Sequence, residues 1–583
     1  MPRTHLVALE ASVRDFFRSV HRYPLAALGL VALGLVSWFG THSAAQAPQY
    51  DLLIVNGRIL DGSGGPWFQG SVAVKDGRIA DVGRLPGATA RQVIDAKGLV
   101  VAPGFIDLHS HSDYTLLVDG KAQSMIRQGV TTEILGEDSS AAPVLGPAVA
   151  DFDKGLERYG LKRDWESLGQ YFARLERQGI SLNIASYVGS GQVRRCVMGN
   201  VNRAPTAEEL TRMKALVEQS MREGAIGLSS GLIYVPNTFA KADELVELAT
   251  VAAKCGGIYA SHIRSESDTS LSAIDEAIEI SEEAGLPTHI FHFKKSGRPN
   301  WGHMPEQIER IQAARDRGLD ITADQYPYIA AMTGLEMCIP PKYQEGTLEE
   351  FVARLKDSKV RAEIGHAIET GLPGWGDNEV KSVGGWHGVQ VASLQKSENK
   401  QYEGKRMDEV AKMMGKDPLD ALCDLLISEG GAAEGVYFGM NEADVALAMK
   451  QPWVGIGSDG SAVSPDMEFI GKPHPRFYGT FPRVLGHYVR EKKVLTLPEA
   501  IRKMTSLSAA ITGLTDRGLL RPGMAADISV FDPAAVADKA TFENPLQYSV
   551  GIEYVIVNGT VVLNKGEHTG AQPGRALRGR GKM

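Results

Sequence analysis

The sequence predicts an α/β protein: a closed (β/α)8 barrel of the TIM type, joined to a small β-sandwich domain formed by both ends of the chain. Two observations predict this fold class. In the middle of the chain, candidate strands end at Ser229, His262, His292 and Asp324, which are 33, 30 and 32 residues apart, as in consecutive strand–helix units. Near both ends, short β segments instead precede Asn-Gly or Asp-Gly turn signals.

Eight strands are expected in the middle of the chain, which is the number that closes such a barrel. They cover residues 105–109, 131–135, 182–188, 226–229, 258–262, 288–292, 320–324 and 453–458. Helices are expected at residues 122–128, 165–177, 207–223, 243–254, 271–284 and 305–317. Thr206, with Glu209 three residues later, forms a capping box that opens the third of these helices. The barrel is placed at residues 103–517, and its long excursion at 335–450 is interpreted as a lid.

The β-sandwich domain is expected at residues 48–102 and 518–570. Segments 52–55 and 71–74 precede turn signals at one end of the chain, and segment 554–557 precedes Asn558-Gly559 at the other. Residues 571–583 follow as a basic tail, which we interpret as a solvated end; its charges are Arg575, Arg578, Arg580 and Lys582.

The composition is that of a globular protein. Of 583 residues, 43% are hydrophobic and 23% are charged, which excludes a disordered chain, a collagen-like repeat and a disulfide scaffold. The net charge of -8 and the lack of a basic domain argue against a nucleic-acid partner. We therefore expect a small-molecule substrate.

The first 47 residues have the pattern of an export signal. Arg14, Arg18 and Arg22 precede an uncharged run at 24–39, and small residues at 43–47 offer cleavage sites. The prediction is a secretory signal and a periplasmic or secreted protein, with an uncleaved membrane anchor as the alternative. The four cysteines are far apart and show no metal or redox spacing, so we expect them to be buried apolar residues: Cys196, Cys255, Cys338 and Cys423.

Histidines and carboxylates gather where the predicted barrel strands end. His109 and His111 point the same way from the first strand, because side chains alternate along an extended chain. Further candidates end or follow other strands: Glu137, His262, His292 and Asp459. Barrel enzymes collect their catalytic residues at the C-terminal strand ends. This set therefore predicts a zinc or two-metal site.

Several motifs carry a family resemblance. Residues 103–113 (PGFIDLHSHSD) resemble the first-strand motif of the amidohydrolase superfamily, whose members are metal-dependent hydrolases with a barrel fold. The N-acyl-D-amino-acid deacylase (D-aminoacylase) branch is similar in five further segments, which are 227–236 (GLSSGLIYVP), 261–266 (SHIRSE), 324–328 (DQYPY), 474–476 (HPR) and 518–527 (GLLRPGMAAD). The resemblance runs from about residue 50 to 583 with the motifs in the expected order.

The resemblance implies a set of metal ligands and one departure from the family. It places His109 and His111 on one metal, His262 and His292 on a second, and Asp459 as ligand and proton shuttle. Related deacylases place Cys after Gly-Asn at the second strand, whereas this chain has Gly136-Glu137-Asp138-Ser139. We predict Glu137 as the bridging ligand and Asp138 as the alternative. One or two Zn²⁺ ions are expected, and a carboxylate in place of a thiolate relaxes the preference for Zn²⁺ over other divalent metals.

The implied reaction is hydrolysis of an N-acyl-D-amino acid to a carboxylate and a free D-amino acid by metal-activated hydroxide. The substrate's carboxylate needs a cationic partner. The positions that resemble the family's substrate-binding residues are Lys294 and Arg476, with Tyr234, Tyr326 and Tyr328 as further contacts. His289 is expected to be a packed neighbour, whereas His303 and His387 are candidates for the lid.

Two other hypotheses stay open at this point. A dipeptidase or a cyclic-amide hydrolase, similar to dihydroorotase or hydantoinase, can use the same scaffold, because a fold does not fix its substrate. A non-catalytic binding protein is the hypothesis from a different class, and the complete set of histidines and Asp459 argues against it.

Overall fold

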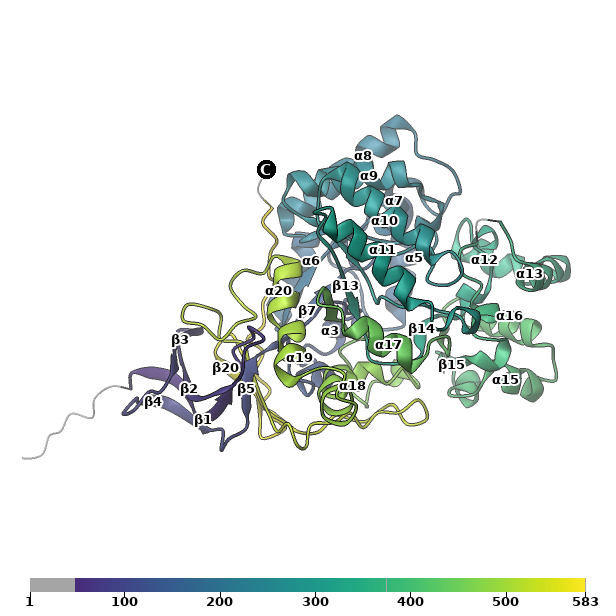
Figure 1. Cartoon of the computed structure of the whole chain (residues 1–583). Coiled ribbons are helices and arrows are strands. Elements are labelled where there is room, and N and C mark those ends of the chain that lie inside the picture. Colours follow the sequence, from purple (N-terminus) through teal and green to yellow (C-terminus); the bar gives the residue numbers. More distant parts are fainter. Residues whose placement is uncertain (1–47, 374, 582–583) are drawn as a thin grey trace, which may run out of the picture.

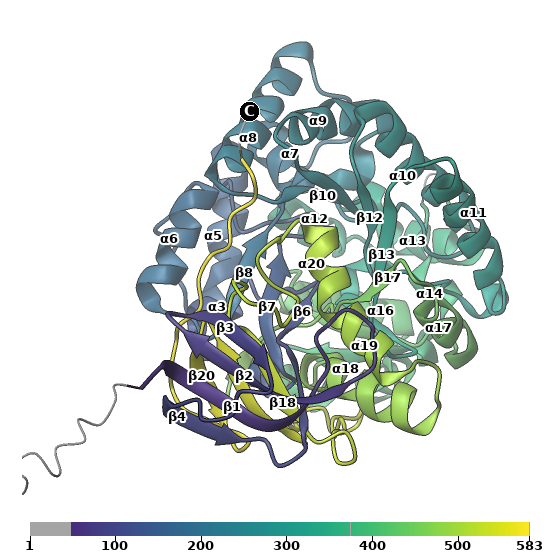
Figure 2. The ribbon, with the colours of Figure 1, turned by 60° about the vertical axis from the view of Figure 1, so that its left-hand side comes forward.

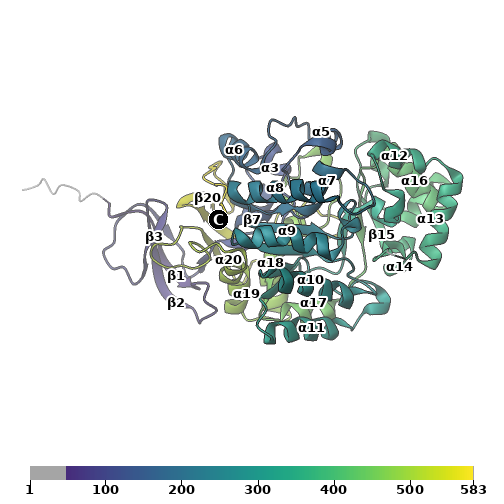
Figure 3. The same ribbon diagram turned by 90° about the horizontal axis from the view of Figure 1, so that it is seen from above.

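The computed structural model describes residues 48–373 and 375–581 (Figure 1). The predicted export segment, 1–47, and Lys582 lie outside the described residues. The described chain has three parts in a row: a β domain, a barrel, and an insertion on the far side of the barrel. Figure 3, the view from above, keeps the same order. Within this part of the chain no helix is both long and apolar enough to cross a membrane.

Eight parallel strand positions form the barrel, as the sequence predicts. In order they are β6 (Phe105–Asp107), β7 (Val130–Leu135), β8 (Asn183–Ser186) with β9 (Val188–Gly189), β10 (Gly227–Gly231), β11 (Ile258–His262), β12 (Thr288–Ile290), β13 (Ile321–Gln325) and β17 (Val454–Ile456). The third strand is interrupted at Tyr187, which divides it into β8 and β9. The first and last strands meet where the His111 amide donates to Gly460 O at 2.7 Å and the Asp459 amide to His109 O at 2.7 Å.

Helices surround the strands (Figure 2). Those that follow the barrel strands are α3 (Thr115–Val118), α4 (Gln123–Ile126), α5 (Val149–Glu157), α6 (Leu168–Gln178), α7 (Ser190–Met198), α8 (Ala207–Glu223), α9 (Ala242–Lys254), α10 (Ser270–Ala284), α11 (Met304–Asp316), α17 (Glu442–Met449), α18 (Arg476–Arg483), α19 (Leu497–Met504) and α20 (Ser506–Thr512). The predicted capping box is present: the Glu209 amide donates to Thr206 Oγ1, and the Thr206 amide to Glu209 Oε2.

Both ends of the chain build one β domain. Its nine strands are β1 (Tyr50–Ile59), β2 (Phe68–Lys75), β3 (Arg78–Gly83), β4 (Ala90–Asp95), β5 (Val100–Pro103), β18 (Ile528–Phe531), β19 (Ile552–Val557), β20 (Thr560–Asn564) and β21 (Glu567–His568). Antiparallel pairing of β5 with β18 joins the two halves. Apolar side chains from both halves share a core, for example Leu52, Val72, Ile528 and Val530.

The insertion folds as a unit with its own core. Its antiparallel sheet contains β14 (Ala331–Gly334), β15 (Val389–Ser393) and β16 (Glu434–Tyr437), and its helices are α12 (Leu348–Arg354), α13 (Ser358–Thr370), α14 (Glu379–Ser382), α15 (Met407–Met414) and α16 (Pro418–Ser428). The sheet starts a few residues before the predicted lid. The last predicted lid residues form α17, whose Val445, Ala448 and Met449 pack into the barrel's clusters.

The basic tail is not a solvated end, which corrects the interpretation from sequence. Its backbone runs along the barrel beside β8, where Leu577 N donates to Ile184 O at 2.7 Å and Ile184 N to Arg575 O at 2.9 Å. Arg578 lies over the ring of Phe172, 5.0 Å from its centroid. The arginine side chains are exposed, as in a solvated end. The charge pattern therefore could not predict that the backbone between them pairs with β8. The four cysteines are buried and unpaired, as predicted.

Candidate metal centre

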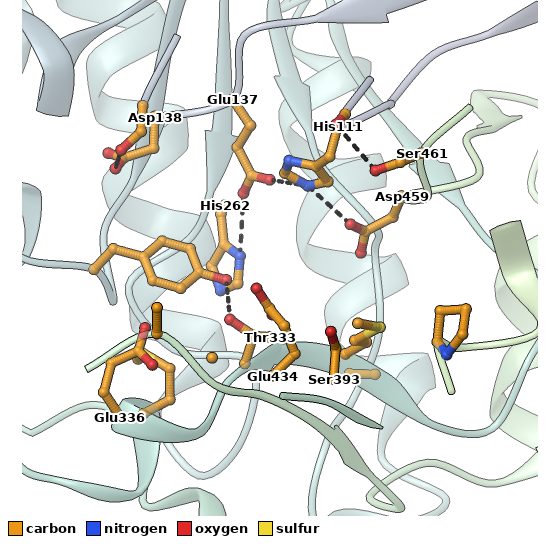
Figure 4. A pocket seen from close by; sticks show the side chains of 18 of the residues that line it. His111, Glu137, Asp138, His262, Thr333, Glu336, Ser393, Glu434, Asp459 and Ser461 are labelled. Carbon is orange, nitrogen blue, oxygen red and sulfur yellow. Dashed lines mark hydrogen bonds and ion pairs between the residues drawn. The ribbon is translucent and has the colours of Figure 1, made fainter. Parts of the chain in front are cut away.

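Glu137 lies at the centre of the predicted ligands, and Figure 4 shows it between His111 and His262, one member of each histidine pair. Its Oε2 is 2.8 Å from His109 Nε2 and 3.1 Å from His111 Nε2. Its Oε1 is 3.3 Å from His262 Nδ1 and 3.6 Å from His292 Nε2. One carboxylate thus presents one oxygen to each pair, which is the arrangement of a bridging ligand.

Asp459 completes the first of two groups of ligand atoms. Its Oδ1 is 3.1 Å from His111 Nε2 and 4.0 Å from His109 Nε2. With Glu137 these atoms all lie within 4.8 Å of one another, and a second such group contains Glu137 and the other two histidines. The six residues predicted as ligands are therefore brought together, although β6 and β17 are about 350 residues apart in sequence.

Asp138 points away from the histidines (Figure 4). Its Oδ1 accepts a hydrogen bond from the Gly231 amide at 3.0 Å and another from Asn237 Nδ2 at 2.9 Å. It therefore ties the loop after β7 to the end of β10. Of the two carboxylates left open by the sequence, only Glu137 faces the histidine pairs.

The loops that carry these residues have unusual backbone conformations. Asp138, His292 and Asp459 have φ angles of 48°, 36° and 50°, in the left-handed region that few residues other than glycine adopt. Such conformations cost about 1–3 kcal/mol each and persist where the surroundings hold them. At His292 the holding group is Asp324, whose Oδ1 accepts the His292 amide at 3.0 Å.

The two serines that alternate with His109 and His111 fix the loop after β6. Ser110 and Ser112 alternate with the histidines and each donates to Glu133 Oε1 at 2.9 Å. Burial, with the nearby Asp107 carboxylate, raises the pKa of Glu133 to about 8. The alternation along the chain thus separates a ligand face, with the two histidines, from a supporting face, with the two serines.

The donor set fits a divalent metal. Two buried atoms that face each other at the centre, Glu137 Oε1 and His262 Nδ1, have no hydrogen-bond partner among the described residues. Burial opposes ionisation of Glu137, but the rings of His109, His111 and His262 hold the pKa of Glu137 well below its usual range. Conversely, Asp459 and Glu137 raise the pKa of His111 well above its usual value despite burial. An ionised carboxylate is ready to bind a metal, and a bound ion would replace the proton that His111 holds.

Two predicted substrate-binding cations lie beside the centre and flank one ring. Arg476 Cζ is 4.7 Å and Lys294 Nζ 5.7 Å from the centroid of the Tyr326 ring. Arg476 Nη1 is 2.8 Å from Asp459 Oδ2, whereas Lys294 donates to Glu266. Both cations are therefore held by carboxylates at the edge of the metal centre.

The predicted tyrosines are placed differently from one another. Tyr234 lines the cavity and its hydroxyl is 3.1 Å from Thr333 Oγ1, across in the insertion. The Tyr326 ring also lines the cavity, but its hydroxyl is directed to Met440 Sδ. Tyr328 is the prediction that the structure contradicts: it lines another cavity, and its hydroxyl donates to Pro475 O at 3.4 Å. The chain bends at residues 327–329 after β13 ends, so the two tyrosines do not lie on one strand face.

The remaining histidines lie outside the centre. His289 hydrogen-bonds Thr322 and Asp324 at 2.9 Å each, so it is the bonded neighbour that we expected. His303 and His387, the candidates for the lid, are exposed and pair with Glu306 and Asp408 instead. Neither lines the cavity next to the metal centre.

Comparison with known proteins identifies the family. Residues 92–563 match the amidohydrolase family. The chain is 36% identical to a D-aminoacylase of Alcaligenes xylosoxydans xylosoxydans over 92% of this chain and 99% of that one. The chain belongs to the amidohydrolase family.

Two solved structures are also similar to this amidohydrolase. One is an N-acyl-D-glutamate deacylase of Bordetella bronchiseptica, complexed with zinc and a phosphonate that mimics the tetrahedral intermediate; it has a TM-score of 0.77 and 33% identity, over 91% of this chain and 99% of that one. The other is a D-aminoacylase with a binuclear metal centre, with a TM-score of 0.75 and 32% identity, over 91% and 100%. The chain is thus a metal-dependent hydrolase of linear amide C–N bonds, of the N-acyl-D-amino-acid deacylase type.

The amidohydrolase encloses a cavity of about 560 Å³ between the barrel and the insertion. Carboxylates that line it and that were not assigned a role from the sequence are Asp113, Glu266, Glu336, Glu379 and Glu434. Glu266 follows His262 by four residues in a motif that resembles the family, so its position offered a signal. Glu336 and Glu379 belong to the insertion, where the sequence has no periodicity that would direct them to the cavity.

Proposed function

We propose that this amidohydrolase releases D-amino acids with neutral side chains from their N-acyl derivatives, at a metal centre bridged by Glu137. The observation that carries the proposal is the position of Glu137, which presents one oxygen to each of two histidine pairs. Beside it, Lys294 and Arg476 supply positive charge for a substrate carboxylate.

The residues that would hold the metal are the six that converge at the barrel's C-terminal end: His109, His111, Glu137, His262, His292 and Asp459. A bound divalent ion polarises a carbonyl and lowers the pKa of water to about 7. Four imidazoles with two carboxylates suit Zn²⁺, and also Mn²⁺ or Co²⁺, because no thiolate is present. We propose Zn²⁺ as the first metal to test.

Asp459 is the group that we assign to proton transfer. Burial opposes its ionisation, but the Arg476 guanidinium and the His109 ring hold the pKa of Asp459 well below its usual range, so it is ionised at neutral pH. An ionised carboxylate at the edge of the centre can accept a proton from the attacking water and return it to the leaving nitrogen. Arg476, 2.8 Å away, keeps the carboxylate aligned for both transfers.

Recognition of the substrate's α-carboxylate is assigned to the two cations that flank the Tyr326 ring. Arg476 is 2% exposed and its Nε has no partner among the described residues, so a donor remains available. Lys294 adds a second positive charge, 5.7 Å from the centroid of the same ring. Two cations favour a substrate with a free carboxylate, which a hydantoin ring lacks.

The side-chain preference follows from charge in the wall contributed by the insertion. Glu336 and Glu379 form no salt bridge with any described residue, whereas Arg158 is paired with Glu434. Unpaired carboxyls repel an acidic side chain once they ionise. On the barrel side, Arg195 donates to neutral acceptors and lies near Asp138. The Asp138 carboxylate offsets the positive charge of Arg195. We therefore propose neutral D-amino acids as products.

Selectivity against acidic substrates is expected to increase with pH. Burial and the neighbouring Glu434 raise the pKa of Glu336 to about 8, so its carboxyl is neutral below that pH and negative above it. Between pH 7 and 9, the ratio of kcat/KM for N-acetyl-D-leucine to that for N-acetyl-D-glutamate should rise about fivefold. Because a ratio of two kcat/KM values is compared, ionisations that change hydrolysis of both substrates equally cancel. Glu336→Gln should reduce the rise without abolishing it, because burial also raises the pKa of Glu379 to about 8. Glu369→Gln, an exposed residue of α13, should leave the rise unchanged; an equal rise in all three proteins would contradict the assignment.

The proposed function is tested by metal removal and a substrate panel. The chelated protein is expected to be inactive, and Zn²⁺, Mn²⁺ or Co²⁺ to restore amine release in proportion to metal bound. The D-aminoacylase relative is described by one-metal activation and second-metal attenuation, so activity should be followed against metal equivalents. The panel contains N-acetyl-D- and N-acetyl-L-amino acids, dipeptides and a hydantoin. Absence of release from every D-configured N-acyl substrate would end the proposal.

A further inference from the structure

A segment of the insertion docks on the loop that follows β11. It lies between α13 and α14 and includes Gly376 and Asp377. A Cβ at Gly376 would lie 2.3 Å from Arg264 O, so the two backbones approach each other as closely as glycine alone permits. Asp377 is 6% exposed although it belongs to a loop. The segment therefore forms a closely packed contact between the insertion and the barrel.

The Asp377 carboxylate receives four hydrogen bonds from three consecutive residues of that loop. Its Oδ2 accepts the Glu266 amide at 2.8 Å. Its Oδ1 accepts Ser265 Oγ at 2.7 Å, the Ser267 amide at 3.3 Å and the Ser267 hydroxyl. Hydrogen bonds to a charged group are stronger than those between neutral groups, so this contact fixes the turn.

Glu266, at the centre of the turn, extends to the metal centre. Its Oε1 is 2.8 Å from His292 Nδ1 and also accepts a hydrogen bond from Lys294. Its Oε2 is 3.8 Å from His262 Nε2. Glu266 is 8% exposed, so these are contacts inside the protein. A shift of the Glu266 backbone would therefore move the Lys294 ammonium, whereas the other ring nitrogen of His292, Nε2, keeps its place 3.6 Å from Glu137 Oε1.

The loop has anchors that do not depend on Asp377. Arg264 Nε donates to Glu276 at 2.9 Å, and Lys295 Nζ donates to Ser267 O at 2.7 Å. These contacts hold the two ends of the turn to the barrel, whereas only Asp377 holds the Glu266 amide from the insertion side. Removing Asp377 should therefore free the Glu266 side chain without unfolding the loop.

We propose that Asp377 is a positioning residue: through Glu266, it lets the insertion set the Lys294 ammonium for the substrate's carboxylate. The inference rests on the proposed function, because it takes Lys294 to bind that carboxylate. It gives a role to Asp377 in the loop between α13 and α14, which does not itself line the cavity. The effect should appear in substrate binding more than in chemistry.

The decisive variant is Asp377→Asn. An amide can keep the acceptor for the serines, but its NH2 group then faces the Glu266 N–H, so that bond is lost. KM for N-acetyl-D-leucine is expected to rise about tenfold, with kcat within about threefold of wild type, because the substitution weakens an interaction that Lys294 makes with bound substrate. Metal content is expected to stay unchanged. Asp417→Asn is the matched control, since Asp417 caps α16 of the same insertion.

A double-mutant cycle separates positioning from general loosening. In a Lys294→Met background, Asp377→Asn should change kcat/KM by less than about twofold, because the group that it positions is gone. Independent, additive losses in the two backgrounds would overturn the proposal, as would an unchanged KM or an equal loss in Asp417→Asn. If Asp377→Asn does not fold, Ser267→Ala removes one donor to the same carboxylate and should shift KM in the same direction. Failure of the wild-type protein to hydrolyse any N-acyl-D-amino acid would instead refute the proposed function.

Discussion

Asp459→Asn is expected to fold, to retain most of its metal and to lose amide hydrolysis by about 10²–10⁴-fold, the contribution of a positioned acid–base group. The amide is similar in size but cannot accept the proton, and the Arg476 guanidinium at 2.8 Å loses its counter-charge. His109, His111 and Glu137 remain to hold the metal. The measurements are metal content by elemental analysis and kcat with N-acetyl-D-leucine.

Asp444→Asn is the control for loss of a buried carboxylate. Asp444 is 5% exposed and accepts the Gly302 amide, and it does not line the cavity. This variant should keep near-normal turnover. Near-normal turnover in Asp459→Asn or Asp459→Ala would exclude Asp459 as the proton-transfer group.

Glu137→Gln is expected to weaken metal binding by more than about 100-fold and to abolish turnover at low metal concentration, since loss of groups around a metal, even outside direct contact, costs 10–100-fold. The reason is that both histidine pairs approach the same carboxylate, at 2.8 Å on one side and 3.3 Å on the other. An amide presents one neutral oxygen, so at most one pair keeps its partner. Isothermal titration calorimetry with the metal ion measures the change in affinity.

Asp138→Asn is the matched control for Glu137→Gln, because the two carboxylates are adjacent in sequence. Asp138 supports the loop through Gly231 and Asn237, so its amide variant should lose some stability and keep its metal. If metal binding were lost in Asp138→Asn and retained in Glu137→Gln, the bridging assignment would have to be reversed.

The barrel could be predicted because its determinants are local. Strand ends at Ser229, His262 and His292 recur at the length of one strand and one helix, and the glycines that end the helices mark the joints. The ligand positions follow from the same pattern, since the C-terminal ends of parallel strands meet around one axis. This rule alone predicts that His109 and Asp459 lie close together, as they do in the structure.

Other features depend on contacts between segments that have no pattern in common. The basic tail has the composition of a solvated end, yet its backbone pairs with Ile184 because an edge beside β8 accepts it. Tyr326 and Tyr328 have the same spacing as residues on one strand face, but the chain turns at Pro327 and only Tyr326 reaches the cavity.

The sequence by itself determined the fold class, the two-ended β domain and the residue types of the metal centre, because periodicity and strand ends are properties of neighbouring residues. Only the tertiary structure decided that Glu137 rather than Asp138 faces the histidines, since both follow β7 and differ in which way the backbone turns. It also decided that Asp377 reaches Glu266 across 111 residues. Such a contact is set by how the insertion packs on the barrel, and no local spacing encodes it.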